Sequence, residues 1–353
     1  PKLNSNATLL ETGKRKNMGD WFADLFGFPE VSARAVYENL KIEKNEMHSL
    51  ANGRCFAVGT LSTPSLCELR HEFQEVKDQA KGRITVSNLS GEAGELHCDP
   101  ENYGALFQVA SQFNLLEMLG PEVTPEKGIS GYINDKTQGP SCALAAAPAT
   151  VFRNYFVTVE GCSGQSRERQ IDCLEDIGDM LGNEQNSLWR MKNGYALDCF
   201  GGLARINKRL GEMSEANIDL LRQKLRVGLH SGVEVTHQNA PRNQQVSQVF
   251  CSALPVGYSQ SPAQEWRRFA QLILDAAYEA TIGAGVINFV KTGVNKVYLT
   301  QLGGGVFGNN MVWIYKAIER ALTIYEAFGL DVKIVSHGNI DDDLNELEKR
   351  WKR

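Results

Sequence analysis

Apolar and polar residues alternate along much of this chain with the periods of strands and helices. Short β-rich runs predict strands at 54–62, 83–91, 245–259, 296–305 and 330–338. Apolar residues at helical spacing predict helices at 63–80, 261–285 and 310–329. Strands separated by helices of this length favour a mostly parallel or mixed sheet with helices on both faces, which is a three-layer α/β/α fold.

Three segments depart from this alternation. Residues 18–43 have helical spacing, and we expect 1–83 to be a mainly helical N-terminal extension. Residues 151–245 contain charged amphipathic helices, which predict a helical lobe inserted into the sheet domain, and 339–353 predict a charged C-terminal tail or helix. The stretch 99–120 suits either a buried strand running into a loop or a helix.

Composition narrows the class of protein. The chain has 353 residues, of which 42% are hydrophobic, so it can form a large core. A net charge of −5 with interspersed signs gives no reason to expect a nucleic-acid partner. No run reaches the roughly 18 apolar residues of a membrane span, and residues 1–17 lack a signal-peptide core, so we expect a cytoplasmic protein without a membrane partner.

The cysteines and histidines follow no metal-binding motif. The eight cysteines are scattered and include no CxxC pair, so we expect them to be reduced and mostly structural. We predict no metal ligands and no cofactor from this spacing. His97 and His230 are isolated, with no serine or cysteine at a recognisable nucleophile elbow.

A glycine-rich loop near the C-terminal end is the strongest functional signal. The run 297–300 predicts a strand, Gly303 to Gly305 and Gly308 follow it, and a helix comes next. Glycines allow close backbone approach, and the first N–H groups of a helix favour an anion such as a diphosphate. The loop is neither a P-loop nor a dinucleotide fingerprint. A glycine turn that only lets the helix pack on its strand is the alternative.

The stretch "VYLTQLGGGVFGNN" with the following helix and "LDVKIVSHG" resembles the second phosphate-binding loop of macrodomains. "FQVASQFNLLEM" resembles the macrodomain strand that meets the distal ribose, and "TQGPSCALAAA" is similar to the first glycine loop. The resemblance covers 84–338 in the family's order and implies an ADP-ribose-binding, macrodomain-like mixed sheet. The enlarged chain resembles the poly(ADP-ribose) glycohydrolases and, more closely, MavL-type hydrolases that remove ADP-ribose from ubiquitin.

The resemblance also implies a set of ADP-ribose contacts. Acidic residues after the first strand would meet the adenine, and the segment "FQVASQFNLLEM" would meet the distal ribose. The two glycine loops would hold the diphosphate. Phe307 would either stack on the ligand or fill the core beneath the second loop. The implied residues are Glu92, Glu95, Gln112, Asn114, Gln138, Gly139, Ser141, Gly303, Gly304, Gly305, Val306, Phe307, Gly308 and Asn309.

Three carboxylates are candidates for chemistry at an ADP-ribosyl bond, which needs an acid for departure and a base for attack. Asp135 would act as general base or orient a substrate guanidinium, or it is an Asx-turn residue. Glu117 would be the second carboxylate, or a solvated residue. Asp172 shares a helical spacing with Asp176 and Asp179 and would hold an arginine-linked substrate, or it belongs to a solvated face. The paired glutamates of the glycohydrolase signature are missing, so that mechanism does not transfer.

These features predict a protein that binds ADP-ribose and hydrolyses an ADP-ribosyl linkage on a modified protein side chain, with arginine, as in ADP-ribosylated ubiquitin, as one possibility. The expected partner is ADP-ribose or an ADP-ribosylated protein. Two alternatives remain open. One is a reader module that binds ADP-ribose without turnover, and the other is a hydrolase of a free ADP-ribose metabolite.

Overall fold

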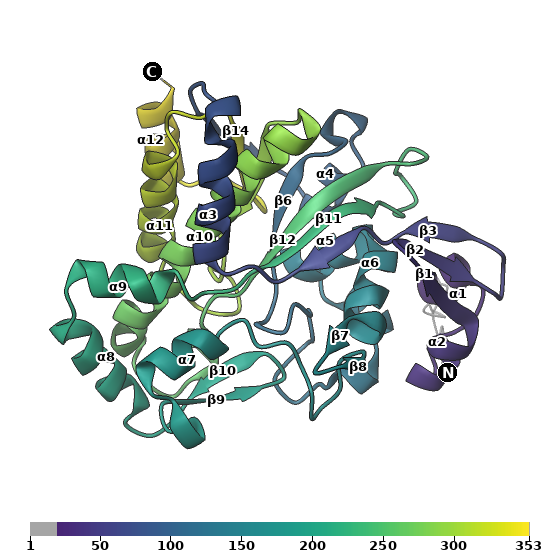
Figure 1. The fold of residues 1–353 in the computed structure, drawn as a ribbon, viewed down its shortest axis with the longest axis horizontal. Helices are drawn as coiled ribbons and strands as arrows, with labels where there is room; N and C mark the ends of the chain where they lie inside the picture. The colour runs from purple at the N-terminus through teal and green to yellow at the C-terminus, as the bar shows by residue number, and fades with distance from the viewer. Residues whose placement is uncertain (1–19, 353) are drawn as a thin grey trace, which may run out of the picture.

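The computed structural model describes residues 20–352, and its centre is a seven-stranded mixed sheet (Figure 1). Across the sheet the strands are β4 (Thr60–Ser62), β11 (Gly228–Glu234), β12 (Gln245–Cys251), β6 (Leu106–Ala110), β13 (Lys296–Thr300), β14 (Asp331–Ser336) and β5 (Thr85–Ser90). The last five are parallel, and β11 is antiparallel to both of its neighbours. The predicted mixed sheet is confirmed, and 106–110 forms a strand.

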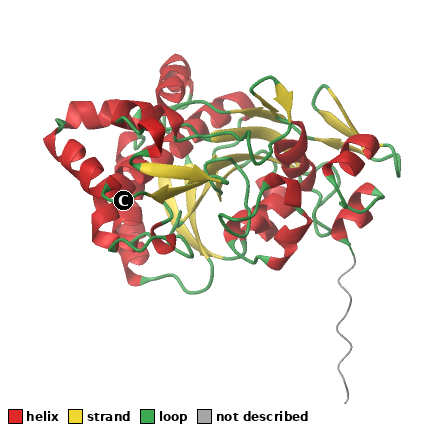
Figure 2. Ribbon diagram, turned by 90° about the horizontal axis from the view of Figure 1, so that it is seen from below, coloured by secondary structure: helices red, strands yellow, loops and turns green. Residues whose placement is uncertain are grey.

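Helices cover both faces of this sheet, as Figure 2 shows from below. One face carries α3 (Leu66–Val76), α8 (Gly202–Glu212), α9 (Glu215–Arg222), α10 (Ala263–Thr292), α11 (Met311–Ile324) and α12 (Asp342–Trp351). The other carries α4 (Ala93–His97), α5 (Gln138–Ala145) and α6 (Ala147–Val151). Because helices cover both faces, β6 and β13 are nearly continuous apolar runs with few exposed positions. The three-layer prediction is therefore confirmed.

In its described part, 20–83, the N-terminal extension has more residues in helices than in strands, but it also contains a small sheet that the prediction missed. After α1 (Trp21–Phe26) and α2 (Ala33–Asn39) the chain forms a separate sheet of β1 (Leu40–Glu43), β2 (Glu46–Ser49) and β3 (Cys55–Ala57). The predicted strand 54–62 splits at Gly59, which has φ +69°, so β4 joins the central sheet instead. Residues 1–19 of the predicted extension lie outside the described residues.

The inserted lobe is shorter and less helical than predicted. Its end at 245 is wrong, because β11 belongs to the central sheet. Besides helices it contains two hairpins. Its own elements, apart from α8 and α9, are β7 (Thr158–Val159), β8 (Cys162–Ser163), α7 (Glu175–Leu181), β9 (Trp189–Lys192) and β10 (Tyr195–Asp198). Asn193-Gly194, a strong hairpin signal, joins β9 to β10.

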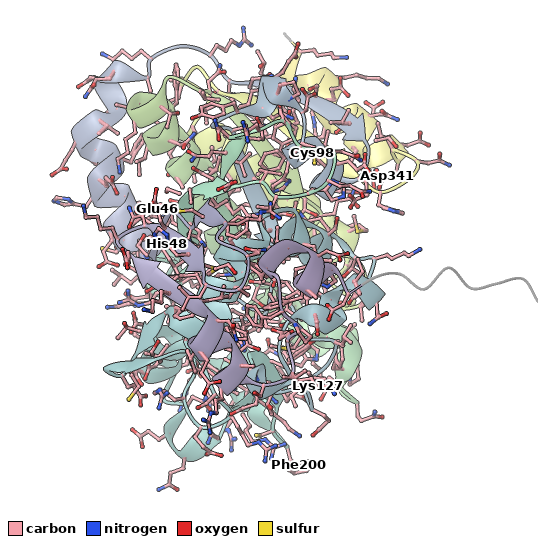
Figure 3. The ribbon with its side chains drawn as sticks, turned by 90° about the vertical axis from the view of Figure 1, so that its right-hand side faces the viewer. Glu46, His48, Cys98, Lys127, Phe200 and Asp341 are labelled. Atoms are coloured by element: carbon pink, nitrogen blue, oxygen red, sulfur yellow. The ribbon has the colours of Figure 1, made fainter. Side chains whose placement is uncertain are left out.

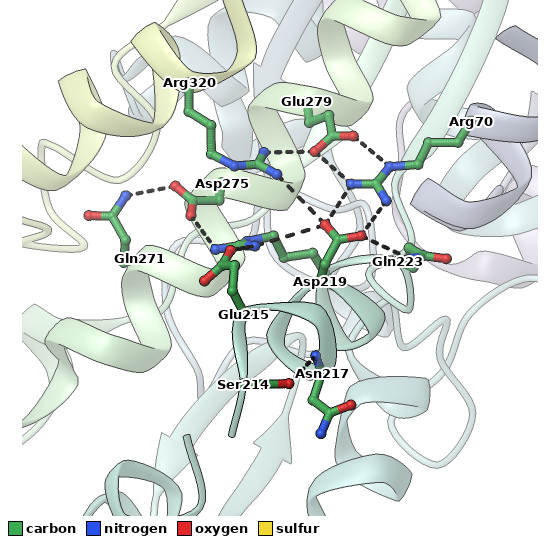
Figure 4. A network of polar contacts seen from close by, with 11 residues as sticks. Arg70, Ser214, Glu215, Asn217, Asp219, Gln223, Gln271, Asp275, Glu279 and Arg320 are labelled. Carbon is green, nitrogen blue, oxygen red and sulfur yellow. Dashed lines mark hydrogen bonds and ion pairs between the residues drawn. The ribbon is translucent and has the colours of Figure 1, made fainter. Parts of the chain in front are cut away.

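Helix α10 is the centre of the larger core. Its length and apolar composition would suit a membrane span, but 89% of that apolar stretch is buried inside the fold. It nevertheless carries Glu279, whose side chain is 2% exposed. Arg70 of α3 contacts this carboxylate at 2.6 Å, and Arg320 of α11 contacts it at 2.7 Å. Arg70 also pairs with Asp219 of α9 at 2.6 Å, so one network joins four helices (Figure 4).

Removing one arginine from this network is expected to destabilise the fold. Arg70→Ala leaves a buried carboxylate with Arg320 as its remaining cation, so we expect a loss of about 2 to 3 kcal/mol of unfolding free energy in urea denaturation. Arg34→Ala removes an exposed ion pair to Glu38 and is the control, with a change below about 0.5 kcal/mol. Equal effects of the two substitutions would contradict a structural role for the network. Glu279→Gln in the Arg70→Ala background should restore part of the loss.

Candidate functional site

A cleft of about 580 Å³ lies at the carboxyl ends of the parallel strands. Its walls come from the residues that follow β5, β6, β12, β13 and β14, from the 135–140 segment, and from the hairpin of the lobe. Open α/β sheets place ligands at this end of their strands, and the volume suits a ligand of nucleotide size. The cleft is therefore the candidate binding site.

The glycine loop after β13 forms one wall of the cleft. Gly303 has φ +76°, and a Cβ there would lie 2.4 Å from the Cβ of Ala253, so only glycine fits. Asn309 closes the loop: its backbone N–H donates to the Gly303 carbonyl at 2.9 Å, and its side chain donates to the Leu254 carbonyl at 2.8 Å. Asn309 is buried and, with Gly308, does not line the cleft. Both were predicted to contact ligand, and both instead shape the loop.

Backbone donors in this loop are free to bind an anion. Within residues 20–352 the N–H groups of Gly305, Val306 and Phe307 have no hydrogen-bond acceptor, and all three residues line the cleft. A Cβ on Gly305 would meet nothing within 4 Å, so this part of the loop faces open space. Consecutive free N–H groups form a concave cradle for an anion. The loop can therefore hold a phosphate or diphosphate without a lysine.

The predicted first glycine loop, at Gln138 and Gly139, holds the start of α5 against the end of β6. The Gln138 side chain accepts from the Ala110 N–H at 2.9 Å and donates to the Gln108 carbonyl at 2.8 Å. A Cβ on Gly139 would lie 2.0 Å from the Ala110 carbonyl oxygen, so glycine is required for this approach. Gln138 and Gly139 line the cleft, but their contacts are structural, and Ser141 lies outside its lining.

The predicted ribose anchor is only partly at the cleft. Gln112 lines it, but its amide is occupied, because Oε1 accepts from the Met118 N–H at 2.8 Å and Nε2 lies 3.3 Å from the Tyr195 hydroxyl. Asn114 is fully buried outside the lining, and its Nδ2 donates to Gln170 at 2.8 Å. The prediction that Asn114 meets the ribose is therefore wrong, because the loop turns this side chain toward the lobe.

Glu117 is a buried carboxyl group in the wall of the cleft. It is 1% exposed, and neither of its oxygens has a hydrogen-bond partner in the described chain. Arg153 Nη2 lies 3.5 Å from Oε1, which is too long for a good hydrogen bond. Burial raises the pKa of Glu117 to about 8, and the guanidinium of Arg153 only partly offsets this. At neutral pH the carboxyl group is therefore mostly protonated and can donate to a bound group.

Arg153 is held by contacts other than Glu117. Its Nε donates to the Leu115 carbonyl at 3.0 Å, its Nη2 donates to Thr150 at 3.1 Å, and the guanidinium lies 3.8 Å from the centre of the Phe250 ring. The arginine therefore keeps its position without a strong bond to the carboxyl group. This leaves both Glu117 oxygens without a hydrogen-bond partner in the described chain.

Of the other acidic candidates, two line the cleft. Asp135 lines it, and its Oδ1 also accepts from the Thr137 N–H at 2.8 Å, which is the Asx-turn role considered above. Glu92 lines it and caps α4 by accepting from the Glu95 N–H at 3.2 Å. Glu95 itself is exposed outside the lining, so its predicted adenine contact is not supported.

Asp172 lies away from the cleft, so the prediction that it acts there is wrong. Its Oδ1 accepts from the Leu174 N–H at 2.8 Å, just before α7 begins at Glu175. Asp176 on that helix pairs with Arg226 at 2.9 Å. The predicted stripe therefore does not form one helical face, because its first member precedes the helix.

Sequence reasoning named Phe307 but missed the two tyrosines that lie beside it in the cleft. Tyr195, Tyr258 and Phe307 all line it, and their ring centres lie 5.2 to 5.7 Å apart. Tyr195 follows the Asn193-Gly194 turn, which would have revealed the hairpin but not where the hairpin packs. These rings offer apolar surface to a base or a sugar.

No protein-family profile matches this sequence, and no curated protein matches it. Among solved structures, the poly(ADP-ribose) glycohydrolase of Thermomonospora curvata bound to the inhibitor ADP-HPD aligns with a TM-score of 0.39 and 11% identity, over 90% of this chain and 97% of that one. The Deinococcus radiodurans glycohydrolase in complex with ADP-ribose aligns with a TM-score of 0.41 and 10% identity, over 82% and 92%.

The chain is distantly similar to poly(ADP-ribose) glycohydrolases. The similarity is a distant one of fold, so the assignment of the site rests on the residues of the cleft. The closer resemblance to MavL-type hydrolases stays a prediction from the sequence.

The raised pKa of Glu117 predicts a pH dependence of stability. The folded protein keeps a proton that the unfolded chain releases above pH 4.5, so the unfolding free energy should fall as pH rises from about 4.5 to about 8. The slope from this group is at most about 1.4 kcal/mol per pH unit. Glu117→Gln should remove this component in urea denaturation, whereas Glu122→Gln, at an exposed carboxylate, should not. Parallel pH profiles for wild type and Glu117→Gln would exclude the shifted pKa.

Proposed function

We propose that this protein binds ADP-ribose in the cleft and hydrolyses an ADP-ribosyl linkage on a modified protein side chain. The observation that carries the proposal is that free backbone N–H groups at Gly305, Val306 and Phe307 share one cleft with the protonated, unpartnered carboxyl group of Glu117. The first feature suits a diphosphate, and the second suits an acid for a leaving group.

The order of strands supports this choice of ligand. The glycine loop follows β13, which lies between β6 on one side and β14 and β5 on the other. Glu117 comes from the segment after β6, and Glu92 comes from the turn after β5. β6 and β5 are separated by three interstrand spacings, which is about 14 Å. An extended ADP-ribose would therefore place its diphosphate centrally, its adenine toward Glu92 and its distal ribose toward Glu117.

Hydrolysis of this bond then needs an acid, a base and one water molecule. The bond between the anomeric carbon and the side-chain nitrogen or oxygen breaks, and the leaving atom takes the proton of Glu117. Water supplies its oxygen to the anomeric carbon and gives one proton to a base. We assign this base to Asp135, because Glu92, the other cleft carboxylate, would lie toward the adenine. The products are ADP-ribose and the free side chain.

A protein-linked substrate is favoured by the surface around the cleft. Leu119 and Val306 line it and are 50% and 62% exposed, so they present apolar surface to a modified protein. We place arginine first among linkages because the Asp135 carboxylate would pair with a guanidinium. The linkage is decided by assaying a panel of arginine-, serine- and glutamate-linked substrates that includes ADP-ribosylated ubiquitin.

A reader function is the second candidate. The Asp135 carboxylate already accepts a backbone hydrogen bond from Thr137, which favours a structural role for this group. A protein in which Asp135 only shapes the loop would bind ADP-ribose and release it unchanged.

Binding is tested at Gly305, where a side chain would enter open space without straining the fold. We expect calorimetry to show ADP-ribose binding by the wild type and a loss of at least about a hundredfold in affinity for Gly305→Glu, because its carboxylate would occupy and repel the diphosphate position. Gly305→Ala is the matched control and should bind within a few-fold of the wild type. If the wild type does not bind ADP-ribose, the proposed function is overturned.

Turnover is tested at Glu117. We expect Glu117→Gln to bind ADP-ribose normally and to lose on the order of a hundredfold or more in single-turnover hydrolysis, because the amide cannot give up a proton. Hydrolysis by the wild type should decline as pH rises through about 8, where Glu117 ionises. Release of ADP-ribose at an unchanged rate by the variant would remove Glu117 from the mechanism. Binding without turnover in the wild type would establish the reader function.

A further inference from the structure

Three side chains of different chemistry converge on the N-terminal sheet, remote in sequence from the residues of the cleft. His48 Nε2 lies 3.6 Å from the Glu46 Oε2 and 3.9 Å from the Cys55 Sγ. All three donor atoms lie within 4.8 Å of one another. Figure 3 labels Glu46 and His48 as neighbours on this sheet.

The strand register forces these groups onto one face. Glu46 and His48 are two residues apart on β2, so they point the same way, and Cys55 of β3 pairs directly with His48. The residues between them, Met47 and Phe56, are paired on the opposite face and are 0% and 1% exposed in the core. The apolar inner face therefore holds the hairpin in the register that brings the three donors together.

We propose that Glu46, His48 and Cys55 bind a zinc-like divalent ion, with its fourth position open to water. Zinc takes thiolate, imidazole and carboxylate ligands, and its bond lengths of about 2.0 to 2.3 Å set tetrahedral donors about 3.3 to 3.6 Å apart. The two distances from His48, 3.6 and 3.9 Å, exceed this range by at most a few tenths of an ångström, and the third pair, Glu46 and Cys55, lies within 4.8 Å. A thiolate with an imidazole selects a borderline or soft ion over magnesium or calcium.

The surroundings are compatible with such an ion. The His48 and Glu46 side chains are 36% and 61% exposed, so an ion can reach them and water can complete its shell. On the neighbouring β1, Glu43 lies opposite Glu46 and Lys41 lies opposite His48, so one carboxylate and one ammonium share this face. The backbone of β3 is anchored by Ala57, whose N–H donates to Glu234 at 2.7 Å.

The ion would join β2 to β3. The two strands share only three residue pairs, so a ligand bridge adds a bond that this short sheet otherwise lacks. Binding to the folded form alone would also stabilise the fold in proportion to the free ion concentration. This site makes no use of ADP-ribose or of the proposed hydrolysis, so the two proposals fail or succeed independently.

The test is a titration of the reduced full-length protein with Co²⁺, which reports thiolate ligation through a charge-transfer band and tetrahedral geometry through intense visible bands. We expect both features in the wild type and their displacement by Zn²⁺. Cys55→Ser should abolish the thiolate band, because it removes the proposed thiolate. His48→Ala should abolish the band or shift its midpoint by more than about a hundredfold, since losing even an outer-shell partner costs about 10- to 100-fold.

Cys162→Ser removes another exposed thiol and is the matched control, which should leave the titration unchanged. Cys55 is exposed, so its substitution should leave the far-ultraviolet circular dichroism unaltered. The absence of a thiolate band in the wild type would overturn the proposal. A band that survives Cys55→Ser, or that disappears in Cys162→Ser, would also overturn it.

Discussion

The arrangement of the helices depends on neutralising two carboxylates that α10 carries into the core. Glu279 pairs with arginines of α3 and α11, and Asp275 pairs with Arg222 of α9 at 3.2 Å. A buried carboxylate without a cation is too costly to tolerate, so each partner helix must present its arginine at one place. Because α9 belongs to the inserted lobe, the same ion pairs help to hold the lobe, whose hairpin carries Tyr195 into the cleft.

Around the cleft several polar side chains are already bonded to the backbone. The amides of Gln112, Gln138 and Asn309 each hold a loop in place, and the Asp135 carboxylate holds a turn. Among the described residues, the groups left without partners include both Glu117 oxygens, the Arg153 Nη1 beside them and the N–H groups of Gly305, Val306 and Phe307. Native proteins seldom leave buried polar groups unsatisfied without a reason. A ligand that brings its own acceptors and donors would complete them.

Periodicity predicted the C-terminal half well, since the strands and helices between 245 and 338 are long and strongly patterned. It failed in the N-terminal part, where Leu40 to Glu43 alternates over only four residues and was absorbed into a helical window. Within the site, the glycine loop was predictable because Gly303 and Gly308 adopt a positive φ, a local conformation that favours glycine. The orientation of Asn114 and Asp172 was not, since each side chain bonds to a neighbour that the local pattern does not specify.

Between 245 and 338 the sequence alone determined the succession of strands and helices and the glycine loop, because hydrophobic period and backbone freedom are local properties. Tertiary structure alone decided which carboxyl group is buried in the cleft, and hence that the pKa of Glu117 is raised while Asp172 lies elsewhere. It alone brought Cys55 to Glu46 and His48. Burial and the distance between residues on different strands depend on how the elements pack, and no short window of sequence contains that information.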